Sequence, residues 1–104
     1  AILFDDIIDT GGTIAAASRA LIERGAKSVS VAATHGIFSD ESVEKLKDTP
    51  IEEIVVTDTL KQNGNIEKIG NVNILSVSSI IATALTSIFA DDSVSAIFMG
   101  ENVL

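Results

Sequence analysis

The chain of 104 residues contains no cysteine, tryptophan or tyrosine, and only one proline, one histidine and one methionine. The absence of cysteine excludes a disulfide framework and a zinc site built on thiolates. It also fits a reducing compartment, so we expect a cytoplasmic protein. No apolar run approaches the roughly 20 residues that a membrane-spanning helix needs, so we expect no membrane partner. The hydrophobic fraction of 46% is that of a globular domain.

Positive charge is scarce as well. The chain has 7 Lys and Arg residues against 15 Asp and Glu residues, which gives a formal net charge of −8. Proteins that bind nucleic acids or anionic membranes neutralise many phosphates with clustered Lys and Arg, so we expect no nucleic-acid partner. A single small phosphate can still be held by backbone amides.

The start of the sequence indicates a piece of a longer protein. Ala1 opens directly into an apolar segment, and the only methionine is Met99. A length of 104 residues is enough for one domain. We therefore expect residues 1–104 to form a single, truncated domain.

Short apolar segments alternate with amphipathic ones along the chain. Ile14, Ala17 and Leu21 recur at helical spacing, whereas the run 1–4 is continuously apolar, as in a strand that is covered on both faces. Strands are expected over 1–4, 28–33, 51–57 and 72–77, and helices over 13–24, 39–47 and 78–90. This alternation predicts an α/β fold with an open, mostly parallel sheet flanked by helices.

The connections carry weaker signals. Residues 58–71 are the least regular region and contain the turn signal Asn63-Gly64. Ser78 or Ser79 is expected to cap the last helix, and Asp91-Asp92 to end it.

The segment 5–13, Asp-Asp-Ile-Ile-Asp-Thr-Gly-Gly-Thr, joins the first predicted strand to the first predicted helix. Asp5 and Asp6 are expected at the end of the strand, where carboxylates can accept hydrogen bonds from sugar hydroxyls. Asp9, Thr10, Gly11, Gly12 and Thr13 follow as a loop, in which glycines allow positive φ and leave room for a phosphate. The amides at a helix N-terminus can then bind the anion. The loop itself contains no Lys or Arg, so the positive charge is expected to come from amides, the helix dipole or a metal ion.

Other interpretations of this segment are weaker. A strand–helix turn with no ligand needs neither the acidic pair nor its position after a strand. A Walker A loop would end in Gly-Lys followed by Ser or Thr, and a dinucleotide fingerprint would read Gly-x-Gly-x-x-Gly. Neither pattern is present here.

The segment 5–13 resembles the ribose-5-phosphate binding motif shared by type I phosphoribosyltransferases and ribose-phosphate pyrophosphokinases. Two further segments, 33–39 and 54–59, and the tail 93–98 are similar to the pyrophosphokinase pattern. Because the resemblance is collinear over essentially the whole chain, the sequence is identified as a member of the pyrophosphokinase family, within its C-terminal domain.

The resemblance implies a function for the longer protein. Ribose-phosphate pyrophosphokinases use Mg²⁺ and transfer the diphosphoryl group of ATP to the C1 hydroxyl of ribose 5-phosphate, giving phosphoribosyl diphosphate and AMP. Family members are homo-oligomers, commonly hexamers. By carry-over, Asp9, Thr10, Gly11, Gly12 and Thr13 bind the 5-phosphate, and Asp5 and Asp6 face the ribose hydroxyls. Four tail residues are implied to contribute to a regulatory site for phosphate and ADP: Ser93, Val94, Ser95 and Phe98.

The family's ATP-binding residues, metal ligands and flexible cationic loop precede the motif and are outside this chain. We therefore expect no catalytic residue and no Mg²⁺ ligand here, and no turnover by the chain alone. Two rival functions stay open: a phosphoribosyltransferase, which lacks the pattern at 34–39, and a catalytically silent homologue that regulates an active enzyme.

Three further groups of residues are expected to be structural. His35, placed just past the second predicted strand, is interpreted as ordering a loop or contacting a subunit. Glu41, Glu44, Lys45 and Lys47 are interpreted as a solvated helix face. The last helix is apolar on more than one face, so we expect part of it to pack on another domain or subunit.

Overall fold

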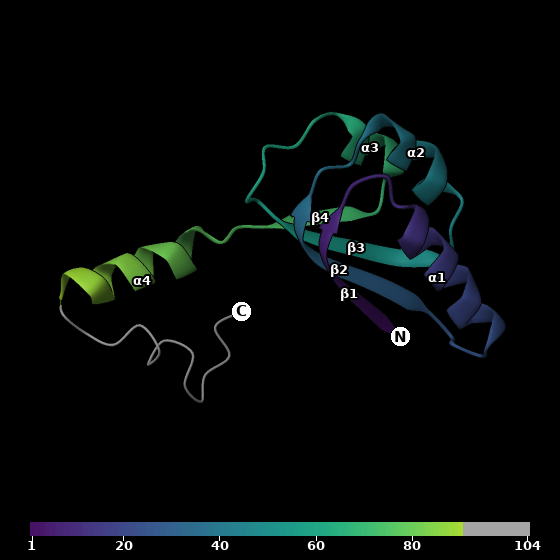
Figure 1. Cartoon of the computed structure of the whole chain (residues 1–104), viewed down its shortest axis with the longest axis horizontal. Coiled ribbons are helices and arrows are strands. Elements are labelled where there is room, and N and C mark those ends of the chain that lie inside the picture. The colour runs from purple at the N-terminus through teal and green to yellow at the C-terminus, as the bar shows by residue number, and fades with distance from the viewer. Residues whose placement is uncertain (91–104) are drawn as a thin grey trace.

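The computed structural model describes residues 1–90. Strands and helices alternate along this part of the chain (Figure 1). The elements are β1 (Ile2–Ile8), α1 (Gly12–Glu23), β2 (Val29–Gly36), α2 (Asp40–Lys47), β3 (Ile51–Thr57), α3 (Asn65–Ile69), β4 (Val72–Leu75) and α4 (Ser78–Phe89).

The strands form one parallel sheet in the order β1-β2-β3-β4. A row of apolar residues crosses it, in which Leu3 pairs with Val31, Val31 with Ile54, and Ile54 with Val72. The predicted α/β class is therefore confirmed, and the sheet is parallel throughout the part of the chain that the structure describes.

Strand order equals chain order, and right-handed crossovers then place successive helices on the same face of the sheet. Figure 1 shows α3 beside α2. The core lies between the sheet and these helices and combines Ile14 of α1 and Leu46 of α2 with the buried strand side chains Val31, Ile54 and Val56.

The opposite face of the sheet is only partly covered. Phe4 is 79% exposed and Leu75 is 53% exposed, while Ala32 and Val55 between them are half-buried. The prediction that the first strand is covered on both faces is therefore wrong for residues 1–90. Its alternate side chains point to opposite faces, and only one face meets the helices.

Two strands continue beyond their predicted ends. Parallel pairing carries on through Asp5–Ala33, Ile7–His35 and Ile8–Gly36, so β1 ends at Ile8 rather than at residue 4. Asp5 and Asp6 thus lie inside β1, and His35 lies inside β2. Carboxylate and imidazole side chains are weak strand signals, but the backbone ladder does not depend on them.

The irregular region 58–71 holds the turn after β2 in place. Phe38 has a φ of 50°, unusual for a bulky side chain, and its ring is fully buried. Its carbonyl oxygen accepts hydrogen bonds from Asn65 Nδ2 at 2.8 Å and Asn63 Nδ2 at 3.2 Å. Asn63 Oδ1 also accepts the Asn65 amide, which confirms the predicted turn, whereas the short helix α3 that follows was not predicted.

The junction between β4 and α4 differs from the expected cap. The N-cap residue of α4 is Val77, not Ser78 or Ser79. Asp58 Oδ1 accepts the Val77 amide at 2.9 Å. This hydrogen bond and one from Ser76 stabilise the carboxylate and lower the pKa of Asp58 below its ordinary value.

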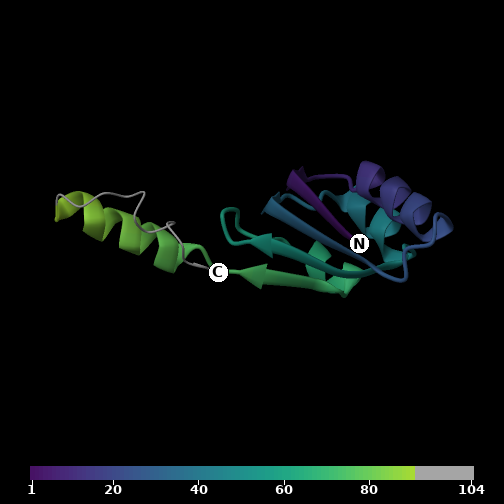
Figure 2. The ribbon, with the colours of Figure 1, turned by 90° about the horizontal axis from the view of Figure 1, so that it is seen from below.

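Helix α4 extends away from the sheet (Figures 1 and 2). None of its residues is buried, and its apolar side chains Ile81, Leu85, Ile88 and Phe89 are 48–86% exposed. That another domain or subunit covers this helix stays a prediction. The expected terminator Asp91-Asp92 and the tail 93–98 lie outside the described residues.

No helix among residues 1–90 combines the length and the apolar character that crossing a bilayer would require.

Replacing Asn65 should destabilise the protein, because Asn65→Ala removes the buried 2.8 Å bond to Phe38 and the 3.1 Å bond to Asp40. We expect the free energy of unfolding in urea to fall by about 1–2 kcal/mol. Asn73→Ala is the control, since it breaks only an exposed bond to Glu53. Equal losses for the two variants would contradict this account of the turn.

Candidate functional site

A hollow lies at the carboxyl end of β1, where it passes into α1. It is lined by Asp5, Ile7 and Ile8 from the strand and by residues 9–14 that follow. Ligands of open parallel sheets bind at this end of the strands. The structure thus brings Asp5 together with Asp9, Thr10, Gly11, Gly12 and Thr13, as the sequence predicts.

Gly11 gives the glycine loop (residues 9–13) its shape. It is the N-cap of α1, is buried and has a φ of +80°. A Cβ added there would lie 2.7 Å from Leu46 Cγ, and Leu46 is itself only 2% exposed. Both the backbone conformation and the contact with α2 therefore require glycine at this position.

Gly12 is a glycine for a different reason. It is the first residue of α1 and is absent from the left-handed region, so of the two loop glycines only Gly11 uses the positive φ that glycine allows. An added Cβ would meet Lys45 Nζ at 3.5 Å and Thr10 Oγ1 at 3.9 Å, which is ordinary van der Waals contact. The missing side chain leaves a small space between a cation and a hydroxyl.

The first turn of α1 offers hydrogen-bond donors to a ligand. Gly11 has no side chain to cap the helix, and the first turn contains no acidic residue. The Ala15 amide already bonds to the Gly11 carbonyl at 2.9 Å. The preceding amides, those of residues 12–14, are the ones that an α-helix leaves without an internal acceptor, and they border the hollow.

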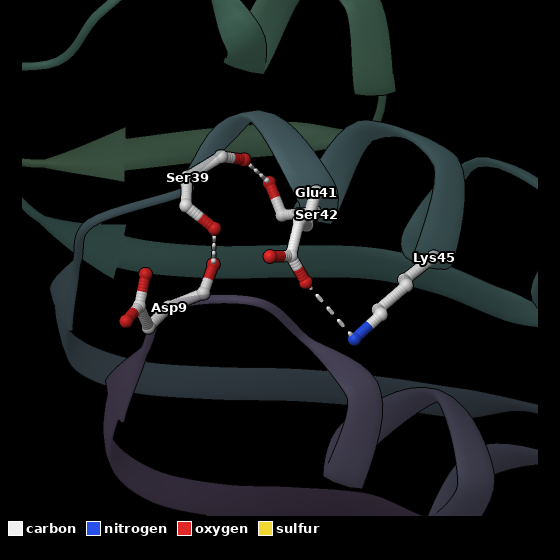
Figure 3. A network of polar contacts seen from close by, with 5 residues as sticks. All are labelled: Asp9, Ser39, Glu41, Ser42 and Lys45. Carbon is white, nitrogen blue, oxygen red and sulfur yellow. Dashed lines mark hydrogen bonds and ion pairs between the residues drawn. The ribbon is translucent and has the colours of Figure 1, made fainter.

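The turn after β2 holds the glycine loop from the other side. The amides of Ile37 and Phe38 donate to the Ile8 carbonyl at 2.8 and 3.2 Å. The amide and hydroxyl of Ser39 both donate to the Asp9 carbonyl, at 3.1 and 3.3 Å (Figure 3). Ser39 is the N-cap of α2, as predicted, but its hydroxyl bonds to the loop instead of to its own helix.

Lys45 is exposed on α2, in agreement with the predicted solvated helix face, and it also lies close to the glycine loop. It extends from α2 toward the start of α1 and forms an ion pair of 3.3 Å with Glu41 (Figure 3). Sequence reasoning could not find it, because Lys45 lies 33 positions after Gly12 and the two meet only when α2 packs beside α1.

The two adjacent carboxylates of β1 are placed differently. Asp5 lines the hollow, whereas Asp6 is absent from its lining. Asp5 Oδ1 accepts the Asp6 amide at 2.8 Å. Across residues 1–90, no three His, Cys, Asp or Glu side chains converge on one point.

His35 is tied to the loop that follows β3. Its Nδ1 lies 2.7 Å from Thr59 Oγ1, and Thr57 Oγ1 donates to the neighbouring Thr34 carbonyl. This contact agrees with the predicted role in ordering a loop.

Comparison with known protein families identifies the family of this chain. The family model described as "Phosphoribosyl synthetase-associated domain" matches residues 1–99. The chain belongs to this family. The coverage extends over β1, the glycine loop and every other described element.

Two of the similar proteins are both named ribose-phosphate pyrophosphokinase. A ribose-phosphate pyrophosphokinase of Buchnera aphidicola is 47% identical over 97 residues, and one of Corynebacterium glutamicum is 46% identical over 100 residues. These matches cover 93% and 96% of this chain but only 31% and 30% of the relatives, so the chain spans about a third of their length. A crystal structure of phosphoribosylpyrophosphate synthetase from Mycobacterium smegmatis, 41% identical, matches 86% of this chain and 30% of that one with a TM-score of 0.77.

Gly11→Ala should lower the free energy of unfolding by about 2–4 kcal/mol, because it adds left-handed strain and an overlap with buried Leu46. Gly25→Ala is a matched control, with a φ of +104° but no atom within 4 Å of the added Cβ. Urea unfolding of both variants measures the difference. A loss at Gly11 no larger than that at Gly25 would show that the contact with Leu46 is unimportant.

Proposed function

We propose that this chain binds ribose 5-phosphate in the hollow between β1 and α1. The observation that carries the proposal is the uncapped first turn of α1, which begins at a glycine with room for a Cβ at van der Waals distance from Lys45 and Thr10. An anion at such a helix start accepts several amide hydrogen bonds and is favoured by the helix dipole. The pyrophosphokinase names of the relatives indicate which phosphate it is.

Each of the proposed binding residues has a physical role. The amides of Gly12 and Thr13 donate to the phosphate, and the hydroxyls of Thr10 and Thr13 add donors from the sides. The Asp9 carbonyl is held by Ser39, so the loop is ordered before the ligand arrives. Asp5, which lines the same hollow, accepts hydrogen bonds from the ribose hydroxyls. Asp6 is absent from the lining of the hollow, so its proposed contact with the ribose hydroxyls runs through metal-bound water.

The longer protein is proposed to be a ribose-phosphate diphosphokinase. It transfers the β,γ-diphosphoryl group of ATP to the C1 hydroxyl of ribose 5-phosphate and releases AMP. Phosphoryl transfer depends on cations that neutralise the charge on the transferring group, and Mg²⁺ supplies this charge with protein ligands outside residues 1–104. A homo-oligomer, a cytoplasmic location and a regulatory role for Ser93, Val94, Ser95 and Phe98 belong to the same proposal.

Ribose 5-phosphate added to the ¹⁵N-labelled chain should shift the amide signals of residues 9–14. Gly12→Ala should weaken this binding at least about tenfold, since a methyl group fills the space that the phosphate approaches. The same change should leave the fold intact, because the added Cβ meets nothing closer than 3.5 Å.

Gly64→Ala is the matched control, with a φ of −73° and no atom within 4 Å of the added Cβ. It should bind like the parent chain. Asp9→Ala should weaken binding as well. Ligand shifts that avoid residues 9–14, or equal affinities for the Gly12 and Gly64 variants, would contradict the proposed site.

The chain alone should not catalyse the reaction. Incubation with ATP, Mg²⁺ and ribose 5-phosphate should release no AMP above the level seen without protein, because the proposed site holds the sugar phosphate but no group that binds ATP. AMP release that depends on ribose 5-phosphate, measured by chromatography, would overturn this prediction.

A further inference from the structure

A phosphate in the glycine loop needs more positive charge than the loop provides. Residues 9–13 contain one carboxylate and no cation, and Asp5 adds a second carboxylate to the hollow. Helix amides and the dipole are equivalent to about half an elementary charge. A sugar phosphate with nearly two negative charges gains from a cation placed nearby.

Lys45 is placed to provide it. Its Nζ lies 3.5 Å from the point that a Gly12 side chain would occupy, and Thr10 Oγ1 lies 3.9 Å from the same point. Its neighbour Leu46 is buried against Gly11, so the backbone of α2 that carries Lys45 is fixed relative to the loop.

We propose that Lys45 of α2 is a phosphate-binding residue of the glycine loop, and that Glu41 competes with the phosphate for its ammonium group. The inference rests on the proposed function and adds to it a residue that lies outside the motif. The Lys45 side chain is 45% exposed and that of Glu41 is 69% exposed. Their ion pair is therefore weak and easily exchanged for a dianionic partner.

The proposed competition predicts the sign of the change in phosphate affinity when Glu41 is replaced, which a purely structural role of Lys45 would not. If Lys45 only packed against Gly12, Glu41→Gln would raise phosphate affinity no more than Glu44→Gln, which removes another exposed carboxylate of the same helix. If Lys45 binds the phosphate, removing Glu41 frees the ammonium group and raises the affinity. Lys47, exposed on the same helix, provides a matched control for the loss of one positive charge.

The test measures dissociation constants of inorganic phosphate and of ribose 5-phosphate separately, from amide shifts of residues 9–14 at low ionic strength. Lys45→Gln should weaken both by about fivefold, the scale of a half-exposed charge pair. Lys45→Arg should retain most of the affinity, Lys47→Gln should match the parent chain, and Glu41→Gln should bind more tightly. The amide spectrum of each variant reports whether it is folded.

Equal losses for Lys45→Gln and Lys47→Gln would overturn the role of Lys45 and show a general charge effect, while the proposed sugar-phosphate site would stand. Unchanged affinity in Glu41→Gln would overturn the competition. If ribose 5-phosphate binds no more tightly than inorganic phosphate, the assignment of the sugar fails, although the Lys45 result with inorganic phosphate still decides this inference. No phosphate-induced shift in the parent chain would overturn both.

Discussion

The glycine loop depends on the hydrogen bonds that join the end of β1 to the turn after β2. The carbonyls of Ile8 and Asp9 would otherwise point into open space at the edge of the sheet, and residues 37–39 satisfy both. That turn is fixed in its own right by the buried ring of Phe38 and by amide groups from the region after β3. Each layer of the site is thus held by the next segment along the sheet. A chain of hydrogen bonds thus links the irregular region 58–71, through the turn after β2, to the glycine loop.

The topology of the sheet explains why helices cover only one of its faces. Strand order equals chain order, so the connecting helices gather on one face and bury the row of Val31, Ile54 and Val56. Helix α2 lies on that face, and its Leu46 touches Gly11 while its Lys45 reaches the space beside Gly12. The opposite face carries exposed Phe4 and Leu75, and α4 extends away from it with its apolar side chains in solvent.

Charge is balanced locally in this acidic chain. A net charge of −8 disfavours an anionic ligand over most of the surface. Under the proposed function, the uncapped amides, two threonine hydroxyls and Lys45 offset that unfavourable charge at the start of α1. The charges of Lys45 and Glu41 offset each other in their ion pair, whereas Asp5 and Asp9 make the hollow itself acidic.

The sequence by itself determined the α/β class, most helix boundaries and the glycine loop, since helical periodicity, turn residues and short motifs act over a few neighbouring positions. It did not determine the ends of β1 and β2, because backbone pairing carries strands through polar residues such as Asp5 and His35. Nor could it separate the two glycines, of which only Gly11 has positive φ. The short helix α3, the Ser39 bond to Asp9 and the approach of Lys45 to Gly12 were decided only by the tertiary structure. The last two contacts join residues 30 and 33 positions apart, and the crossovers between parallel strands bring these residues together.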